Sequence, residues 1–349
     1  MTTIDFTQLR LEQLITHHVG NKLRDEKYLL SSEVSILEDK TREFLLKYFI
    51  LPVKSEEIYS FYHSVELEMN EMYLLARRLF ENPESHFIPC SQDIAKLLYE
   101  QSMHPKIKEG ELNITYFTNI PFDGNATDAI GIFKSENSVP FLKMNGDKKK
   151  YFINHDYGFE IKGIDKGCII LNVNSEAGYK ILIVDSGTKA AEAQYWKDDF
   201  LKVQPISNEY HQTKEFLTIA KDFVAKQLVE EFGTSKADQI DYLNRSVEFC
   251  KKHEILNKNE FEQEIFKDDD LIDSFRKFDK LYRKENEIEL SDNFEISLQA
   301  IKKQARVLKS VIKLDKNFDI YVHGNRDLIE QGIDERGRKF YKIYYQEES

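Results

Sequence analysis

The feature that most constrains the fold is a change in hydrophobic periodicity close to residue 205. Before it, between residues 110 and 185, apolar and polar side chains alternate in short runs, as they do around Leu112 and Ile114. After it, apolar residues recur every three or four positions, as Phe216 and Ile219 do. Alternation is typical of strands with one buried face, and the longer spacing is typical of amphipathic helices. The two parts of the chain are therefore expected to fold differently.

We predict an α+β chain of two domains, 1–205 and 206–349. The first is expected to be a mostly antiparallel sheet with helices packed on one face. Its strand runs are joined by turn residues such as Asp123-Gly124, and no crossover helices separate them, which argues against a parallel sheet. The second is expected to be a mainly helical region closed by β-strands at 318–322 and 340–345.

Prolines and polar residues place several element boundaries. Pro83 and Pro89 are expected to bound a loop, and Ser91 to cap a short helix that follows it. Pro205 is expected to interrupt a linker near residues 203–208. A late helix is expected to start near Asp292 and Glu295. Its apolar stripe consists of Leu298, Ile301, Ala305, Leu308 and Ile312.

Composition excludes several classes of protein. The three cysteines, Cys90, Cys168 and Cys250, are widely spaced and form no CxxC pair, so neither a disulfide framework nor a zinc site is expected. No apolar run is long enough to span a membrane, and the first residues have no signal-peptide pattern. The sequence therefore predicts a cytoplasmic protein that does not associate with membranes.

Charge is distributed unevenly along the chain. The net charge is −12, which is the wrong sign for a protein that coats DNA by bulk charge. Residues 260–295 carry 13 acidic and 6 basic side chains, a net of −7, with Asp268-Asp269-Asp270 as the densest part. Residues 296–345 carry 11 basic and 6 acidic side chains, a net of +5. Any direct contact with DNA is therefore expected in the C-terminal segment.

The basic residues of that segment fall into two groups. On a continuous helix, Lys302, Arg306, Lys309 and Lys313 would form one ridge beside the apolar stripe. Arg336, Arg338, Lys339 and Lys342 surround the start of the last strand, among Phe340, Tyr341, Tyr344 and Tyr345. Ridges of this kind contact phosphate backbones. The alternative interpretation is a solvated helix face with ordinary core aromatics.

No motif for catalysis, phosphate binding or a metal site is present, and no cofactor is expected. The most enzyme-like combination is Asp123, Asp128 and Lys134, loosely similar to a metal-dependent nuclease core. Such a core needs an acid two residues before the lysine, and Ile132 stands there. His17 and His18 are neighbours in an expected strand, so they point to opposite faces and are not expected to chelate one ion.

The C-terminal residues 312–319, IKLDKNFD, and 322–326, VHGNR, resemble the bacterial nucleoid-associated protein family of the NdpA type. Similar likenesses occur at 164–170, IDKGCII, and 195–201, YWKDDFL, and the resemblance is closest to the version found in Bacteroidetes. It implies a cytoplasmic, nucleoid-associated protein without known enzymatic activity, and it supplies no residue-level DNA site.

Three functions follow from these observations. The leading hypothesis is a nucleoid-associated binding protein with weak, salt-sensitive DNA contact through the C-terminal basic residues. The second is an acidic adaptor that binds basic DNA-processing proteins and reaches DNA through them. The third is a metal-dependent nuclease. Homo-oligomerisation is compatible with all three.

Overall fold

A computed structural model describes residues 4, 6–53, 56–146, 150–161, 163–185, 195–307, 311–322 and 328–347. The chain divides into two compact units, residues 1–206 and 207–349, and each contains its own hydrophobic core. Both helices and antiparallel strands are present, which confirms the α+β class. In the described part of the chain, no helix is long and apolar enough to cross a membrane.

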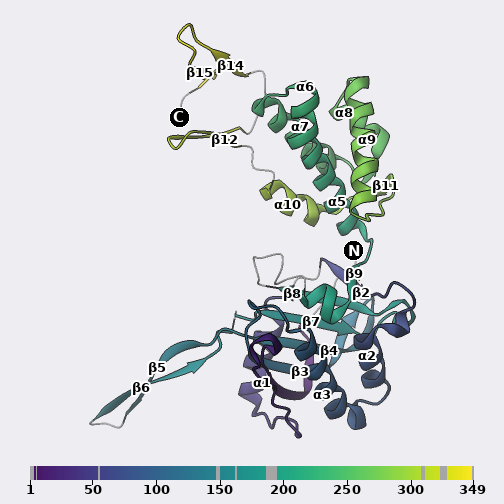
Figure 1. The fold of residues 1–349 in the computed structure, drawn as a ribbon, viewed down its shortest axis with the longest axis vertical. Helices are drawn as coiled ribbons and strands as arrows, with labels where there is room; N and C mark the ends of the chain where they lie inside the picture. Colours follow the sequence, from purple (N-terminus) through teal and green to yellow (C-terminus); the bar gives the residue numbers. More distant parts are fainter. Residues whose placement is uncertain are drawn as a thin grey trace. The chain divides into compact units, whose positions relative to one another are not determined.

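The described residues of the first unit include a seven-stranded sheet (Figure 1). In sheet order its strands are β1 (Arg10–Val19), β3 (Gly110–Phe122), β4 (Asn125–Ser135), β7 (Lys166–Leu171), β8 (Lys180–Asp185), β2 (Ile58–Phe61) and β9 (Val203–Pro205). Every neighbouring pair is antiparallel, as predicted. Asp123 and Gly124, with φ of 47° and 80°, make the tight turn between β3 and β4.

The expected linker at 203–208 is partly wrong, because its first three residues form the edge strand β9. Pro205 lies opposite Tyr59 at the end of that strand. A proline is tolerated on an edge strand because its missing N–H can face away from the sheet.

Helices cover both faces of the sheet, which corrects the prediction of one covered face. The described helices are α1 (Asp39–Ile50), α2 (Glu71–Glu81), α3 (Pro83–Gln101), the short 3-10 helices η1 (Lys22–Arg24), η2 (Leu67–Met69) and η3 (Ser175–Ala177), and the π-helix η4 (Tyr195–Leu201). Buried residues of α2, α3 and η4 share one core with Ile114 and Ile132 of the sheet. Phe49 of α1 packs on the other face, against Phe117 and Phe133. Successive side chains of a strand point to opposite faces of the sheet. The strands therefore contribute apolar residues to both cores.

The helix α3 replaces the loop that the prolines predicted. Pro83 occupies the start of the helix, where its missing N–H costs nothing, and the side chain of Asn82 caps the N–H of Ser85. Pro89 lies inside the helix and removes one backbone hydrogen bond. Ser91 does not cap a helix; its buried hydroxyl donates to the Ile88 carbonyl at 2.7 Å. Burial of the helix face against the sheet offsets the lost bond.

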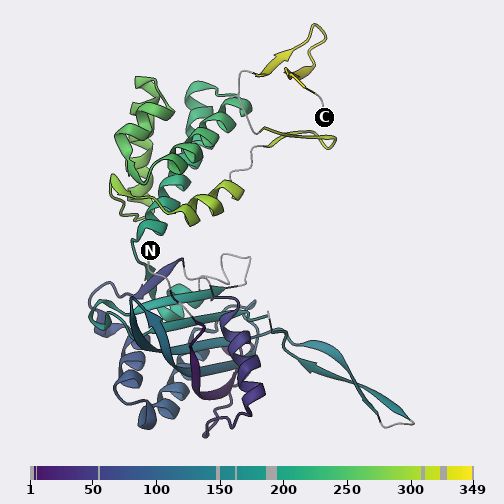
Figure 2. The ribbon, with the colours of Figure 1, turned by 180° about the vertical axis from the view of Figure 1, so that it is seen from behind.

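A separate two-stranded ribbon joins β4 to β7. Its strands are β5 (Val139–Gly146) and β6 (Tyr151–Gly158), which pair antiparallel with each other. The ribbon extends away from the sheet (Figures 1 and 2). All its residues except Gly158 are exposed. Residues 156–158 continue β6, although Asp156 and Gly158 are residue types that favour a turn.

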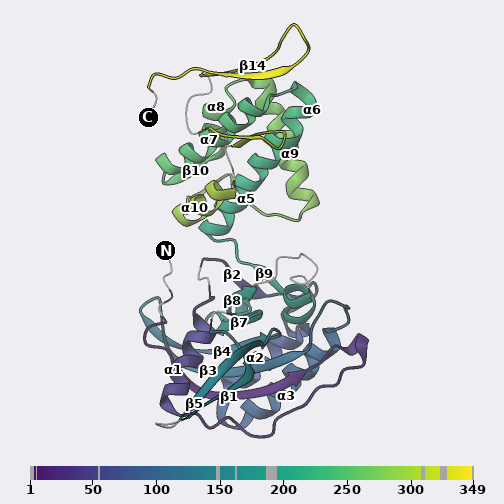
Figure 3. The ribbon, with the colours of Figure 1, turned by 90° about the vertical axis from the view of Figure 1, so that its left-hand side faces the viewer.

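The second unit is mainly helical and carries three small β-pairs (Figure 3). Its described helices are α5 (Glu209–Asp222), the π-helix η5 (Phe223–Gln227), α6 (Leu228–Phe232), α7 (Lys236–Lys252), α8 (Lys258–Ile265), α9 (Asp269–Glu285) and α10 (Leu298–Val307). Its strands are β10 (Ile255–Asn257) with β11 (Asn293–Glu295), β12 (Val311–Leu314) with β13 (Phe318–Tyr321), and β14 (Ile329–Ile333) with β15 (Lys339–Ile343). Helices followed by terminal strands confirm the predicted order.

Packed aromatic rings and polar N-cap side chains stabilise the helices. Phe216, Phe223, Phe261 and Phe275 are fully buried, and each ring lies edge-on to or tilted against another. Six of the described α-helices begin at a residue whose side chain accepts a backbone N–H: Asn70, Asn82, Asn208, Ser235, Asn257 and Asp268. Such caps satisfy N–H groups that the first turn leaves free.

A buried ionic network ties α8 to α9. The Asp279 carboxylate, 2% exposed, accepts hydrogen bonds from Lys258 and from Arg283, the latter at 2.7 Å. Glu262, fully buried, accepts from Arg276 at 2.7 Å. Carboxylates removed from water require such partners. These two carboxylates of the acidic segment 260–295 are therefore structural.

Candidate nucleic-acid interface

The helix expected to carry the basic ridge is shorter than predicted. It begins at Leu298, and Asn293–Glu295 upstream form the strand β11 instead of a helix start. It ends at Val307, and Ile312 lies in β12. The adjacent β-branched residues Val311 and Ile312 favour a strand over a helix because their χ1 angles are restricted. Ile312 is buried in the hairpin core and does not extend the helical stripe.

The four residues of the expected ridge consequently do not share one helix. Lys302 is exposed on α10, and Arg306 lies on the same helix. Lys309 lies outside the described residues. Lys313 is exposed on β12, directly opposite Asp319 of β13. The continuous helical ridge is therefore wrong as a geometry, and whether these residues contact DNA stays a prediction.

The second basic group forms around the β14–β15 hairpin, as the sequence placed it. Arg336 and Lys339 are exposed and form no ion pair within the described part of the chain. Arg338 donates its Nε–H to Asp334 at 2.8 Å. Lys342 lies 3.5 Å from the Glu330 carboxylate and over the ring of Tyr344. The hairpin therefore presents two cations free of carboxylates and two that are partly neutralised.

Asp334 fixes the turn that displays these cations. Its carboxylate accepts the backbone N–H groups of Arg336 and Arg338 at 2.9 and 2.8 Å, and the side chain of Arg338 as well. These bonds hold the pKa of Asp334 below its usual value, with the backbone bond to Arg338 as the largest cause. Gly337 adopts the positive φ of 76° that the turn requires. The role of Asp334 was not predicted from the sequence. An aspartate whose side chain can accept N–H groups two and four residues later is nevertheless a recognisable turn signal.

Aromatic and apolar side chains accompany the cations on both hairpins. Exposed members include Phe318, Tyr321, Phe340, Tyr344 and Tyr345. The opposite sides of the hairpins are anchored, because Ile312, Val322 and Ile329 are buried against Ala237 and Ile240 of α7. The hairpins are therefore held on the helical unit with one side left open to solvent.

The acidic run is explained by a helix start. Asp268 is the N-cap of α9 and accepts the N–H groups of Asp270 and Leu271. Asp269 and Asp270 occupy the first turn, where negative charge interacts favourably with the helix dipole. This density of carboxylates consequently has a structural cause.

The enzyme-like combination is not assembled. Asp128 and Lys134 lie six residues apart on β4, a separation of about 20 Å along a strand. Asp128 accepts a hydrogen bond from Tyr116 at 2.8 Å, and Asp123 is exposed in the β3–β4 turn. No group of three or more His, Cys, Asp or Glu side chains suited to a metal occurs among the described residues. The predicted nuclease constellation is therefore wrong.

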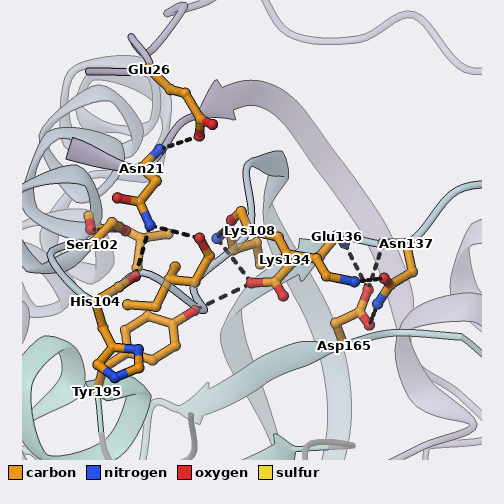
Figure 4. A network of polar contacts seen from close by, with 12 residues as sticks. Asn21, Glu26, Ser102, His104, Lys108, Lys134, Glu136, Asn137, Asp165 and Tyr195 are labelled. Carbon is orange, nitrogen blue, oxygen red and sulfur yellow. Dashed lines mark hydrogen bonds and ion pairs between the residues drawn. The ribbon is translucent and has the colours of Figure 1, made fainter. Parts of the chain in front are cut away.

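Lys134 belongs to a buried structural network (Figure 4). Its ammonium is fully buried and donates to the Glu136 carboxylate at 2.9 Å and to the Lys108 carbonyl at 2.6 Å. Asp165 accepts the backbone N–H groups of Glu136 and Asn137 beside it. Burial lowers the pKa of Lys134, an effect that Glu136 opposes. This arrangement fastens the chain between β4 and β7 and gives the buried ammonium a structural role.

The two neighbouring histidines have separate surroundings. His17 is buried; its Nδ1 accepts the Ser31 N–H at 3.1 Å, and its Nε2 lies 3.0 Å from the Ser91 hydroxyl. His18 is partly exposed and lies 3.2 Å from Glu111. The two rings therefore bind different partners. All three cysteines are buried and unbridged.

Among the described residues, the helical unit therefore carries a solvated basic hairpin that is anchored by its apolar side chains. The family model of the nucleoid-associated protein YejK matches residues 15–337. The chain belongs to that family, which confirms the resemblance noted from its C-terminal and central segments. No curated protein matches the sequence.

Proposed function

We propose that this protein acts in the nucleoid as a binding protein, and that it contacts DNA weakly and in a salt-sensitive manner through its C-terminal hairpins. One observation carries the proposal: Arg336 and Lys339 are exposed at the β14–β15 turn without a carboxylate partner in the described chain. An ion-paired cation must first lose its partner to bind a phosphate, whereas these two need not. Membership of a nucleoid-associated family supports the same conclusion.

The geometry also ranks the other basic residues. Lys302 and Lys313 are exposed and available as further phosphate contacts, although Lys313 faces Asp319 across the hairpin. Arg338 and Lys342 are engaged with Asp334 and Glu330, so we expect them to contribute less. A small number of contacts on a protein of net charge −12 predicts weak binding that falls steeply with salt.

Binding to a duplex across a salt series tests the proposal. The variant Lys313→Ala/Arg336→Ala/Lys339→Ala removes three exposed cations from the hairpins. If all three contact phosphates, the log–log salt slope becomes shallower by about 0.9 per contact, or roughly 2 to 3 in total. Fluorescence anisotropy of a labelled duplex, titrated with the full chain at each salt concentration, measures the slope.

A matched control keeps the net charge equal. Lys277→Ala/Lys280→Ala/Lys284→Ala removes three exposed cations from α9. We expect this variant to retain the wild-type slope. Equal slopes for the two triple variants would show that bulk charge and not the hairpin determines binding, and would refute the proposal.

The adaptor hypothesis remains the second candidate. Asp269, Asp270 and Asp273 are exposed on α9 and present negative charge to solvent. The start of α9 explains Asp269 and Asp270 without a partner protein. We therefore prefer direct DNA contact to the adaptor hypothesis. A wild-type chain that fails to bind duplex DNA even at low salt would favour the adaptor.

A further inference from the structure

The ribbon formed by β5 and β6 has two unlike faces. Side chains alternate along a strand, and the pairing of Leu142 with His155 and of Met144 with Ile153 fixes which residues share a face. One face carries Lys143, Asn145, Asn154 and Asp156 together with Phe141 and Phe152. The other consists of Pro140, Leu142, Met144, Tyr151, Ile153, His155 and Tyr157. The second face, named here the apolar ribbon face, has no carboxylate or ammonium group.

The apolar ribbon face is open to water. Leu142, Met144 and Ile153 are 67%, 63% and 63% exposed, and Tyr151 and Tyr157 are 76% and 63% exposed. Among the described strands, β5 and β6 pair only with each other. An isolated two-stranded hairpin is at best marginally stable in water, and three or more strands or a packed face are needed for stability. The sequence thus places its apolar residues on a ribbon that lacks a packing partner within the described chain.

We propose that the partner is a second copy of this chain, and that the apolar ribbon faces of two protomers pack against each other. Two-fold symmetry brings the same patch of each subunit together, so a mainly apolar patch without carboxylate or ammonium groups is complementary to itself. Two sheets packed face to face about 10 Å apart bury the residues of their inner faces. The charged residues of each ribbon remain on the outer side.

The available area is sufficient for such a dimer. With side-chain areas of roughly 150 to 250 Å², the five large residues of the face expose on the order of 700 Å² per protomer. Two copies would bury about 1,400 Å², within the range of about 1,200 to 2,000 Å² for stable interfaces. The proportion of apolar surface also suits homodimers, whose interfaces are more apolar than those of transient complexes.

The negative net charge of the protein also favours contact through the apolar ribbon face. Each protomer has a net charge of −12, so two copies repel over most approaches. Contact through a face without charged groups avoids placing carboxylates against carboxylates. A DNA ligand fits this face poorly, because phosphates require cations and the face has none.

The mass of the full-length protein in solution tests the proposal. Sedimentation over a concentration series should give twice the 41.2 kDa chain mass for the wild type. Met144→Asp/Ile153→Asp places four carboxylates in the dimer interface and should raise the dissociation constant on the order of 100-fold or more. Because these residues are exposed and outside every core cluster, the fold of each unit should persist, as far-UV circular dichroism would show.

The control places the same charge on the other face. Asn145→Asp/Asn154→Asp changes the two adjacent positions by the same net charge and should leave the dimer intact. A second measurement uses the absence of competing thiols at the surface, since all three native cysteines are buried. Met144→Cys should form a covalent dimer under mild oxidation, and Asn145→Cys should not.

Three results would overturn the proposal. One is a wild type that remains monomeric at the highest concentrations studied. Another is equal weakening by the two aspartate pairs, which would locate the interface elsewhere. The third is a Met144→Asp/Ile153→Asp variant that keeps its mass and loses DNA affinity, which would make the ribbon a groove-binding element. None of these depends on whether the C-terminal hairpins bind DNA.

Discussion

The buried His17 predicts a specific dependence of stability on pH. Ser91 donates its hydroxyl proton to the Ile88 carbonyl, so its oxygen is free to accept from Nε2–H of the imidazole. Nδ1 accepts the Ser31 N–H and would meet that donor if it were protonated. The neutral ring is fully satisfied, and burial lowers the pKa of His17 to about 4. An unfolded histidine has a pKa of about 6.5.

The sign of the effect follows from which state binds the proton. Between pH 6.5 and 4 the unfolded chain is protonated at His17 and the folded chain is not, so acid favours unfolding. The stabilisation that comes from keeping His17 neutral in the folded chain is complete above pH 6.5 and is lost as the pH falls to 4. Linkage gives a loss of about 3 kcal/mol over the whole range and about 2 kcal/mol between pH 7 and pH 5.

The assay uses a natural reporter of the sheet unit. Trp196 is the single tryptophan and is fully buried there, so its fluorescence follows urea unfolding of that unit alone. His17→Gln removes the titrating group and should reduce the loss of stability between pH 7 and pH 5 by about 2 kcal/mol relative to the wild type. His18→Gln changes the neighbouring, partly exposed ring and serves as the control for the substitution itself. Equal pH dependence in wild type and His17→Gln would refute the argument.

Two further predictions concern buried charges. Asp279→Ala leaves two cations partly buried and should lower the stability of the helical unit by about 3 to 5 kcal/mol, measured by circular dichroism, whereas the exposed control Asp270→Ala should cost less than about 1 kcal/mol. Lys134→Met replaces a buried ammonium with an apolar chain, and if Glu136 is changed to Gln in the same protein no uncompensated charge remains. We therefore expect the double variant to be at least as stable as Glu136→Gln alone in urea unfolding followed by Trp196 fluorescence.

The sheet was predictable because its pattern is local. Leu112, Ile114 and Tyr116 alternate with polar residues, and Asp123-Gly124 is the strongest short-range signal for a tight hairpin. The order of the strands was not accessible in the same way. The pairing of β2 between β8 and β9 joins residues more than a hundred positions apart, and no local pattern encodes it.

The errors have different physical causes. Pro89 disfavours a helix, yet α3 continues through it because Phe87 and Ile94 on its inner face are buried against the sheet. Lys313 was assigned to a helix by spacing alone, although the β-branched residues before it pair with β13. The ribbon was not predicted, because apolar alternation normally marks a buried face, whereas Met144 and Ile153 are each 63% exposed.

The negative net charge of the protein links the candidate DNA site to the proposed dimer, because it limits both DNA binding and contact between protomers. A hairpin with two free cations cannot hold DNA tightly against a net charge of −12. Dimerisation through an uncharged face joins two such hairpins without placing acidic surfaces together. Binding of the first hairpin then raises the effective concentration of the second on the same duplex, provided that the DNA is long enough to reach both. Weak DNA contacts at each hairpin and a self-complementary ribbon are therefore compatible in one binding protein, because avidity in the dimer supplies the affinity that a single hairpin lacks.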